Sequence, residues 1–67
     1  MSVAKVTEIT ASSKKSFDHA IKKGIERACK TLKNVTGAWV QDQKVDIKDG
    51  EVVEYRVNMK LTFVLDD

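Results

Sequence analysis

Residues 53–65 read VEYRVNMKLTFVL, a stretch in which apolar and polar side chains alternate. The odd positions from Val53 to Leu65 are all apolar, and the even positions are polar until Val64. Successive side chains of a strand point to opposite faces, so this pattern predicts a strand with one buried and one solvated face. At roughly 3.3 Å per residue the strand would be about 40 Å long, and its apolar face needs a cover.

The whole chain, residues 1–67, has the length of a single small domain. A domain of this size buries a modest share of its surface and is marginally stable unless it is cross-linked or assembled. One cysteine cannot form an internal disulfide, and one cysteine with one histidine is too few for a structural zinc site. We therefore expect self-association to supply stability.

The region upstream predicts one amphipathic helix. Its apolar stripe consists of Phe17, Ala20, Ile21, Gly24, Ile25, Ala28, Cys29 and Leu32. This spacing is typical of a single helical face, and the small residues every fourth position favour close packing of the helix on a sheet. Ala11-Ser12-Ser13 predicts the helix start through its serines, and Asn34 predicts a left-handed stop.

Strand-like segments flank this helix. Residues 2–10 are rich in β-branched side chains, and alternation resumes from Gly37. A polar run over residues 41–44 interrupts it, and a bulge there would restore the phase. Asp49-Gly50 predicts a tight hairpin. The fold class is therefore α+β in the order β-α-β-β.

The predicted helix is shorter than the apolar strand that it must cover. A helix of roughly 20 residues spans about 30 Å, whereas the last strand spans about 40 Å. Another copy of the chain must cover the remaining apolar surface, so the sequence predicts an oligomer.

At this point the chain resembles the dodecins, small flavin-binding proteins that assemble as hollow dodecamers. The resemblance runs nearly end to end and rests on the order and spacing of several segments. These are Thr10-Ala11-Ser12-Ser13, Ala20-Ile21, residues 28–35 (ACKTLKNV), Ile47-Lys48-Asp49-Gly50, Glu54-Tyr55-Arg56-Val57 and Phe63-Val64-Leu65-Asp66. The resemblance implies a three-stranded antiparallel sheet wrapped around one helix, and a homododecameric shell with its helices outward.

The resemblance also implies a ligand, a flavin of the FMN or riboflavin type. Dodecins stack the flavin ring on a tryptophan at the start of the second strand and bond its edge with a glutamine of the third. Counted back from Asp49-Gly50 without a gap, these positions are Gly37 and Arg56 here, and both have changed. Trp39, two residues after Gly37, lies on the same strand face.

Three interpretations stay open. In the first, Trp39 is a displaced stacking platform and Arg56 contacts flavin carbonyls or phosphate, because a guanidinium offers only donors. In the second, the shell has lost flavin and holds another anion or a metal ion such as calcium. In the third, the alignment is shifted by two and Trp39 is the family tryptophan, which would need a compensating change in the hairpin. The ordinary alternatives are a packed or interfacial Trp39 and an Arg56 paired with an acid across strands.

Other polar residues receive structural interpretations. His19 is expected on the helix surface, and Cys29 in the core. The hairpin acids lack the spacing of a calcium loop, although copies of Asp42 or Asp46 meeting at a symmetry axis could bind a hard cation.

The remaining function classes are disfavoured. Seven basic residues on and around the helix suggest nucleic acid only distantly, because no stacking aromatic pair or motif accompanies them. These residues are Lys14, Lys15, Lys22, Lys23, Arg27, Lys30 and Lys33. The sequence offers no evident nucleophile–base pair, phosphate loop or metal-ligand cluster, so we do not expect an enzyme. With no secretory or membrane-spanning segment, we expect a cytoplasmic protein.

Overall fold

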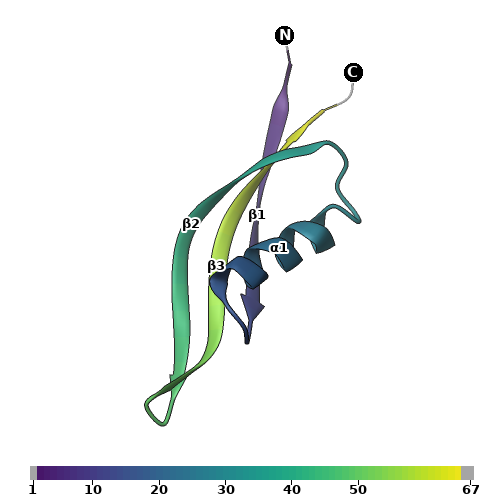
Figure 1. Cartoon of the computed structure of the whole chain (residues 1–67). Coiled ribbons are helices and arrows are strands. Elements are labelled where there is room, and N and C mark those ends of the chain that lie inside the picture. The colour runs from purple at the N-terminus through teal and green to yellow at the C-terminus, as the bar shows by residue number, and fades with distance from the viewer. Residues whose placement is uncertain (1, 66–67) are drawn as a thin grey trace.

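The computed structural model describes residues 2–65, which form three strands and one helix (Figure 1). The elements are β1 (Ala4–Ser13), α1 (Phe17–Ala28), β2 (Val35–Lys48) and β3 (Glu51–Val64). The predicted order β-α-β-β and the α+β class are confirmed. None of the described helices is long and apolar enough to cross a membrane.

The central strand of the antiparallel sheet is β3, because the sheet order is β1-β3-β2. β1 pairs with it from Ala4↔Val64 to Ser13↔Tyr55, and β2 pairs from Val35↔Phe63 to Lys48↔Glu51. The alternating stretch of the sequence is therefore the strand to which both others bond. In Figure 1 the helix lies across one face of this sheet, and the β2–β3 hairpin extends beyond it.

Two local features of the hairpin confirm the sequence pattern. Asp49 and Gly50 both have positive φ, 53° and 79°, which is the backbone of a two-residue hairpin turn. The register of β2 shifts between Val40 and Asp42, so Gln41 is the extra residue that restores the phase. Trp39 and Asp42 consequently share one face although three positions separate them.

The helix begins later than predicted. Ser12 and Ser13 end β1, and the N-cap is Ser16, whose Oγ accepts a 3.0 Å hydrogen bond from the backbone N–H of His19. The prediction that Ser12-Ser13 starts the helix is wrong because pairing with β3 continues through Ser13. Ladder hydrogen bonds to the central strand outweigh a local capping signal here.

The helix also ends earlier than its apolar stripe. After Ala28 the chain tightens into a turn whose hydrogen bonds span three residues in place of four, from Lys30 N to Arg27 O and from Thr31 N to Ala28 O. Cys29 is exposed and not in the core as predicted. Asn34 does adopt a left-handed backbone, with φ of 62°, but at the start of β2 and not at the helix end.

The core lies where α1 crosses β1 and β3. Ala20 packs on Val57 and Met59, with Ile9 and Ile21 at the margin. Gly24 confirms the close approach, because a Cβ there would lie 2.8 Å from Ala11 Cβ and 2.9 Å from Met59 Cε. The repeat of small residues is thus explained by the helix–sheet distance.

The helix covers only the middle of the sheet. α1 has 12 residues, roughly 18 Å of helix at 1.5 Å per residue, whereas the molecule is 52 Å long. Large apolar side chains remain exposed outside the area that the helix covers, and two of them, Val6 and Trp39, lie on the opposite face of the sheet. The exposed residues are Val3, Val6, Trp39, Val40, Ile47, Val52, Val53 and Leu65. The helix is therefore shorter, relative to the sheet that it covers, than the sequence predicted.

Candidate ligand-binding face

The sheet has two chemically different faces. The helix face of β3 carries Tyr55, Val57, Met59, Leu61 and Phe63. The opposite face, here called the open face, carries the even-numbered residues of β3 from Glu54 to Thr62 and their neighbours on β1 and β2. All three residues predicted to contact a ligand lie on the open face.

Trp39 is the aromatic residue of the open face. It stands opposite Lys60 in the β2–β3 register, and its side chain is 57% exposed. Gly37 stands opposite Thr62 on the same face, and a Cβ built at Gly37 would meet nothing within 4 Å. The indole therefore lies beside open space, on the face where a planar ring could stack on it.

A short polar ladder crosses all three strands next to Trp39. Thr10 Oγ1 donates to Asn58 Oδ1 at 2.7 Å, and Asn58 Nδ2 donates to Asp42 Oδ1 at 2.8 Å. Asn58 is the middle residue of the ladder, so its amide orientation is fixed from both sides. The ladder keeps the carboxylate of Asp42 engaged within the chain.

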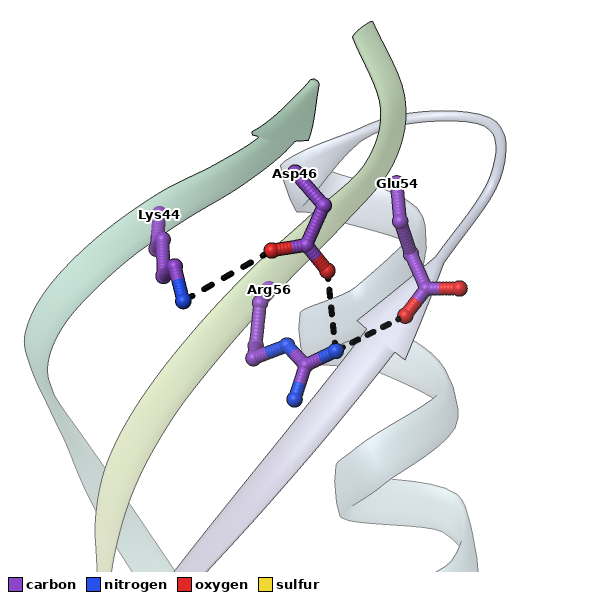
Figure 2. Close-up of polar contacts among 4 residues, drawn as sticks. All are labelled: Lys44, Asp46, Glu54 and Arg56. Carbon is purple, nitrogen blue, oxygen red and sulfur yellow. Dashed lines mark hydrogen bonds and ion pairs between the residues drawn. The ribbon is translucent and has the colours of Figure 1, made fainter. Parts of the chain in front are cut away.

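Arg56 lies further along the open face, in a cluster of four charges (Figure 2). Its Nη2 contacts Asp46 Oδ2 at 2.9 Å and Glu54 Oε1 at 3.2 Å. Lys44 Nζ lies 3.7 Å from the other oxygen of Asp46. In the single chain Arg56 therefore forms ion pairs with Asp46 on the neighbouring strand and with Glu54 on its own strand, as expected of a structural arginine.

One hydrogen-bond donor of Arg56 has no acceptor among the described residues. This donor is the Nε, which is buried. A buried donor without an acceptor costs free energy, so an acceptor brought by a ligand or by a second copy would stabilise this side chain.

Trp39 and Arg56 do not converge. Trp39 is level with Lys60, and Arg56 is four residues further along β3. At roughly 3.3 Å per residue this is about 13 Å along the strand. A single ring stacked on Trp39 would have Lys60, and not Arg56, as its nearest cation on β3.

Two hollows lie away from the open-face residues Trp39 and Arg56. One, of about 550 Å³, lies between β1 and α1 beside Ile9, Gly24 and Leu32, with Lys23 and Arg27 among its lining. A smaller one of about 220 Å³ lies beside Ile25, Cys29 and Gly37. Neither of these two hollows includes Trp39 or Arg56.

Sequence reasoning missed one polar contact. His19, expected on the helix surface, is half-buried, and its Nδ1 lies 2.6 Å from Ser13 Oγ. Ser13 is only 8% exposed, and its Oγ accepts a 2.9 Å hydrogen bond from the backbone N–H of Lys15. These bonds join the end of β1 to the first turn of α1. The six-residue separation gives no periodic signal, so the sequence could not have shown it.

The acids form no ready-made metal site in one chain. Among residues 2–65 there is no group of three or more histidine, cysteine, aspartate or glutamate residues placed to hold an ion. Asp46 is bound to Arg56 and Lys44, and Asp42 to Asn58.

A family comparison decides the identity of the fold. The dodecin family model matches residues 3–66, nearly the whole chain. The protein belongs to the dodecin family. The family resemblance drawn from the sequence is therefore confirmed, whereas no curated protein matches the sequence.

Solved dodecin structures are similar to this chain over nearly its whole length. The dodecin of Streptomyces davaonensis is 35% identical with a TM-score of 0.93, over 98% of this chain and 97% of that one. The dodecin of Streptomyces coelicolor is 30% identical with a TM-score of 0.93, over 98% and 94%.

A third solved structure, with lower sequence identity, has calcium in its name. The calcium dodecin of Mycobacterium tuberculosis, described as calcium chelating, is 25% identical with a TM-score of 0.82. The match covers 96% of this chain and 91% of that one.

Proposed function

We propose that this dodecin assembles as a cytoplasmic homododecamer and sequesters a flavin, FMN or riboflavin, on its open face. The observation that carries the proposal is Trp39, which is 57% exposed beside the vacant space at Gly37. A large aromatic side chain held in water on a largely polar sheet face is a favourable stacking platform.

Assembly is supported by the surface that one chain leaves uncovered. β1 and β2 each bond to β3 on one side only, so both outer edges of the sheet have unpaired backbone groups. The exposed apolar side chains of the hairpin, among them Ile47 at 65%, need cover as well. The hollow between β1 and α1 gives a neighbouring copy a place to pack.

Glycine at position 37, where dodecins have the stacking tryptophan, is compatible with stacking on Trp39 instead. Removing a large side chain at position 37 leaves room above the strand, and Trp39 presents its indole from the same face. Arg56 is too far from Trp39 to contact the stacked ring itself. Its unpartnered Nε can donate a hydrogen bond to another part of the ligand, or to a second chain, that covers the four-charge cluster. Stacking would quench the photochemistry of the flavin, and the shell would buffer its free concentration.

Flavin fluorescence tests this proposal. Titrating the assembled protein into riboflavin or FMN should quench the flavin emission to a saturating end point. Trp39→Ala should abolish saturable quenching, whereas Val40→Ala, the next residue but on the helix face, should retain it. Full quenching by Trp39→Ala, or none by the wild-type protein, would refute the stacking site.

A calcium-binding shell is the second candidate, favoured by the similarity to the calcium dodecin. Asp42 and Asp46 lie on the open face, and copies meeting at a symmetry axis would supply the oxygen ligands that calcium prefers. Native mass spectrometry with added calcium tests it. Adducts lost in Asp42→Asn or Asp46→Asn would support the ion site, and a protein that takes up no calcium would exclude it.

A further inference from the structure

The helix side of the molecule is strongly basic. Seven basic residues and two acidic ones lie between positions 14 and 33, which is a formal charge of +5, whereas the whole chain carries +2. The rest of the chain is therefore net acidic, and most of its acids lie on β2, β3 and the turn between them. The seven residues, here called the basic surface, are Lys14, Lys15, Lys22, Lys23, Arg27, Lys30 and Lys33.

Every side chain of the basic surface is exposed to solvent. The apolar residues of α1 pack on β1 and β3, so the charged side of the helix faces away from the sheet that it crosses (Figure 1). As a result, all the exposed residues within α1 are charged: Asp18, Lys22, Lys23, Glu26 and Arg27.

Few of these cations are neutralised by the chain itself. Among residues 2–65, the one ion pair of the basic surface joins Lys23 Nζ to Glu26 Oε1 at 3.9 Å. Both side chains are more than half exposed, so the pair contributes little. Lys23 and Arg27 are four residues apart on the helix, a spacing at which like charges repel. An anion from outside would relieve this repulsion.

Assembly would leave most of the basic surface in water. The parts of the chain that need cover are apolar side chains and strand edges, whereas burying uncompensated cations costs free energy. Lys23 and Arg27 line the hollow offered to a neighbouring copy, but the other five residues of the basic surface do not.

The acids of a neighbouring copy are too few to neutralise the basic surface. Asp46 and Glu54 are already bound to Arg56. Asp49 and Glu51 flank the hairpin turn and are exposed, and neither forms an ion pair among residues 2–65. Two carboxylates would not balance a formal charge of +5.

We infer that the basic surface binds the phosphate backbone of nucleic acid, without preference for base sequence. Duplex DNA carries about one negative charge per 1.7 Å, so even a short segment faces several of these cations. Assembly as proposed above repeats the surface in each copy, and a long polyanion can contact several copies at once. The inference uses that assembly but not the flavin site.

An anionic membrane fits this surface less well. Helices that bind at a membrane interface insert apolar or aromatic side chains into the lipid. The exposed residues of α1 include none, because its apolar side is packed on the sheet.

The test is the fluorescence anisotropy of a short, labelled DNA duplex of arbitrary sequence, titrated with the wild-type protein at low salt. Binding should be saturable, and the logarithm of the binding constant should fall linearly with the logarithm of the salt concentration. Lys22→Glu reverses one exposed charge in every copy and should weaken binding by about ten-fold or more. Lys48→Glu makes the same change at the end of β2 and should weaken it by less than about two-fold.

A second variant and a second measurement remove the dependence on the folding of Lys22→Glu. Lys30→Glu, which lies outside α1, should weaken binding to a similar extent, and native mass spectrometry of the same samples reports their assembly. A dodecamer that does not bind DNA, or equal losses in Lys22→Glu and Lys48→Glu, would overturn the inference and leave the flavin site untouched. A monomer that does not bind DNA would refute the proposed assembly and the inference together. Binding to vesicles of anionic phospholipid, without binding to DNA, would also overturn the inference.

Discussion

The two faces of β3, residues 51–64, have different roles. On the helix face Val57, Met59 and Leu61 are fully buried, and the side chains of α1 and β1 fill the space above them. On the open face the neighbouring residues form ion pairs and a polar ladder, and the adjacent strand presents Trp39 to solvent.

This difference separates stability from binding within one strand. A substitution on the helix face should change the free energy of unfolding, because it changes packing in a filled core. A substitution on the open face should change ligand affinity and leave folding nearly intact, because surface changes have small effects. The following predictions test that separation.

The largest effect is expected at Met59. Met59→Ala removes a fully buried side chain from the centre of the core and should lower the free energy of unfolding by about 2–5 kcal/mol. Urea denaturation followed by circular dichroism would measure it. Val40→Ala, on the same face but 45% exposed, is the control and should cost far less. Equal costs would mean that the helix does not define the core.

Gly24 and Gly37 allow the same substitution to be compared at a crowded and at an open position. Gly24→Ala forces a Cβ against Ala11 and Met59 and should destabilise the protein by about 1–3 kcal/mol in spite of better helix propensity. Gly37→Ala meets open space and should change stability by less than about 0.5 kcal/mol. Thermal unfolding of both variants checks this, and a stabilised Gly24→Ala would contradict the close helix–sheet packing.

The hairpin turn should show an intermediate effect. Gly50 has φ of 79°, and Gly50→Ala should cost roughly 1 kcal/mol because a side chain disfavours that backbone. Asp49→Asn should be nearly neutral, since asparagine tolerates the left-handed conformation found at Asp49. Chemical denaturation of the two variants would detect the difference, and equal destabilisation would argue against this turn geometry.

The smallest effect on stability is expected at Arg56. Its side chain is 42% exposed, so Arg56→Gln should lower the free energy of unfolding by less than about 1 kcal/mol, and added salt should reduce the difference. Lys44→Gln, at 70% exposure, should cost even less. A large, salt-independent loss for Arg56→Gln would show that the cluster is part of the folding core.

Much of the fold could be predicted because its signals are periodic. The alternation over residues 53–65, the small-residue repeat through Gly24 and the Asp49-Gly50 turn each correspond to one local geometry. The helix boundaries could not, since the pairing of Ser13 with Tyr55 and the turn after Ala28 depend on contacts distant in sequence or on a tightened last turn.

The candidate site was predictable only in part. Because side chains two residues apart in a strand point to the same face, the sequence placed Gly37 and Trp39 on one face, and the register confirms it. The separation of Trp39 from Arg56, and the pairing of Trp39 with Lys60, depend on the register between β2 and β3 and on the bulge at Gln41. The Asp49-Gly50 turn and the bulge predicted within residues 41–44 constrain that register, whereas the register shift between Asp46 and Ile47 had no signal in the sequence.

The most direct test of the account is native mass spectrometry of the wild-type protein and of Trp39→Ala, each with and without FMN. The account predicts a dodecamer in both proteins, with FMN adducts on the wild-type protein and none on Trp39→Ala. A monomer would contradict assembly through the uncovered sheet, and FMN adducts retained by Trp39→Ala would contradict the open face as the flavin site.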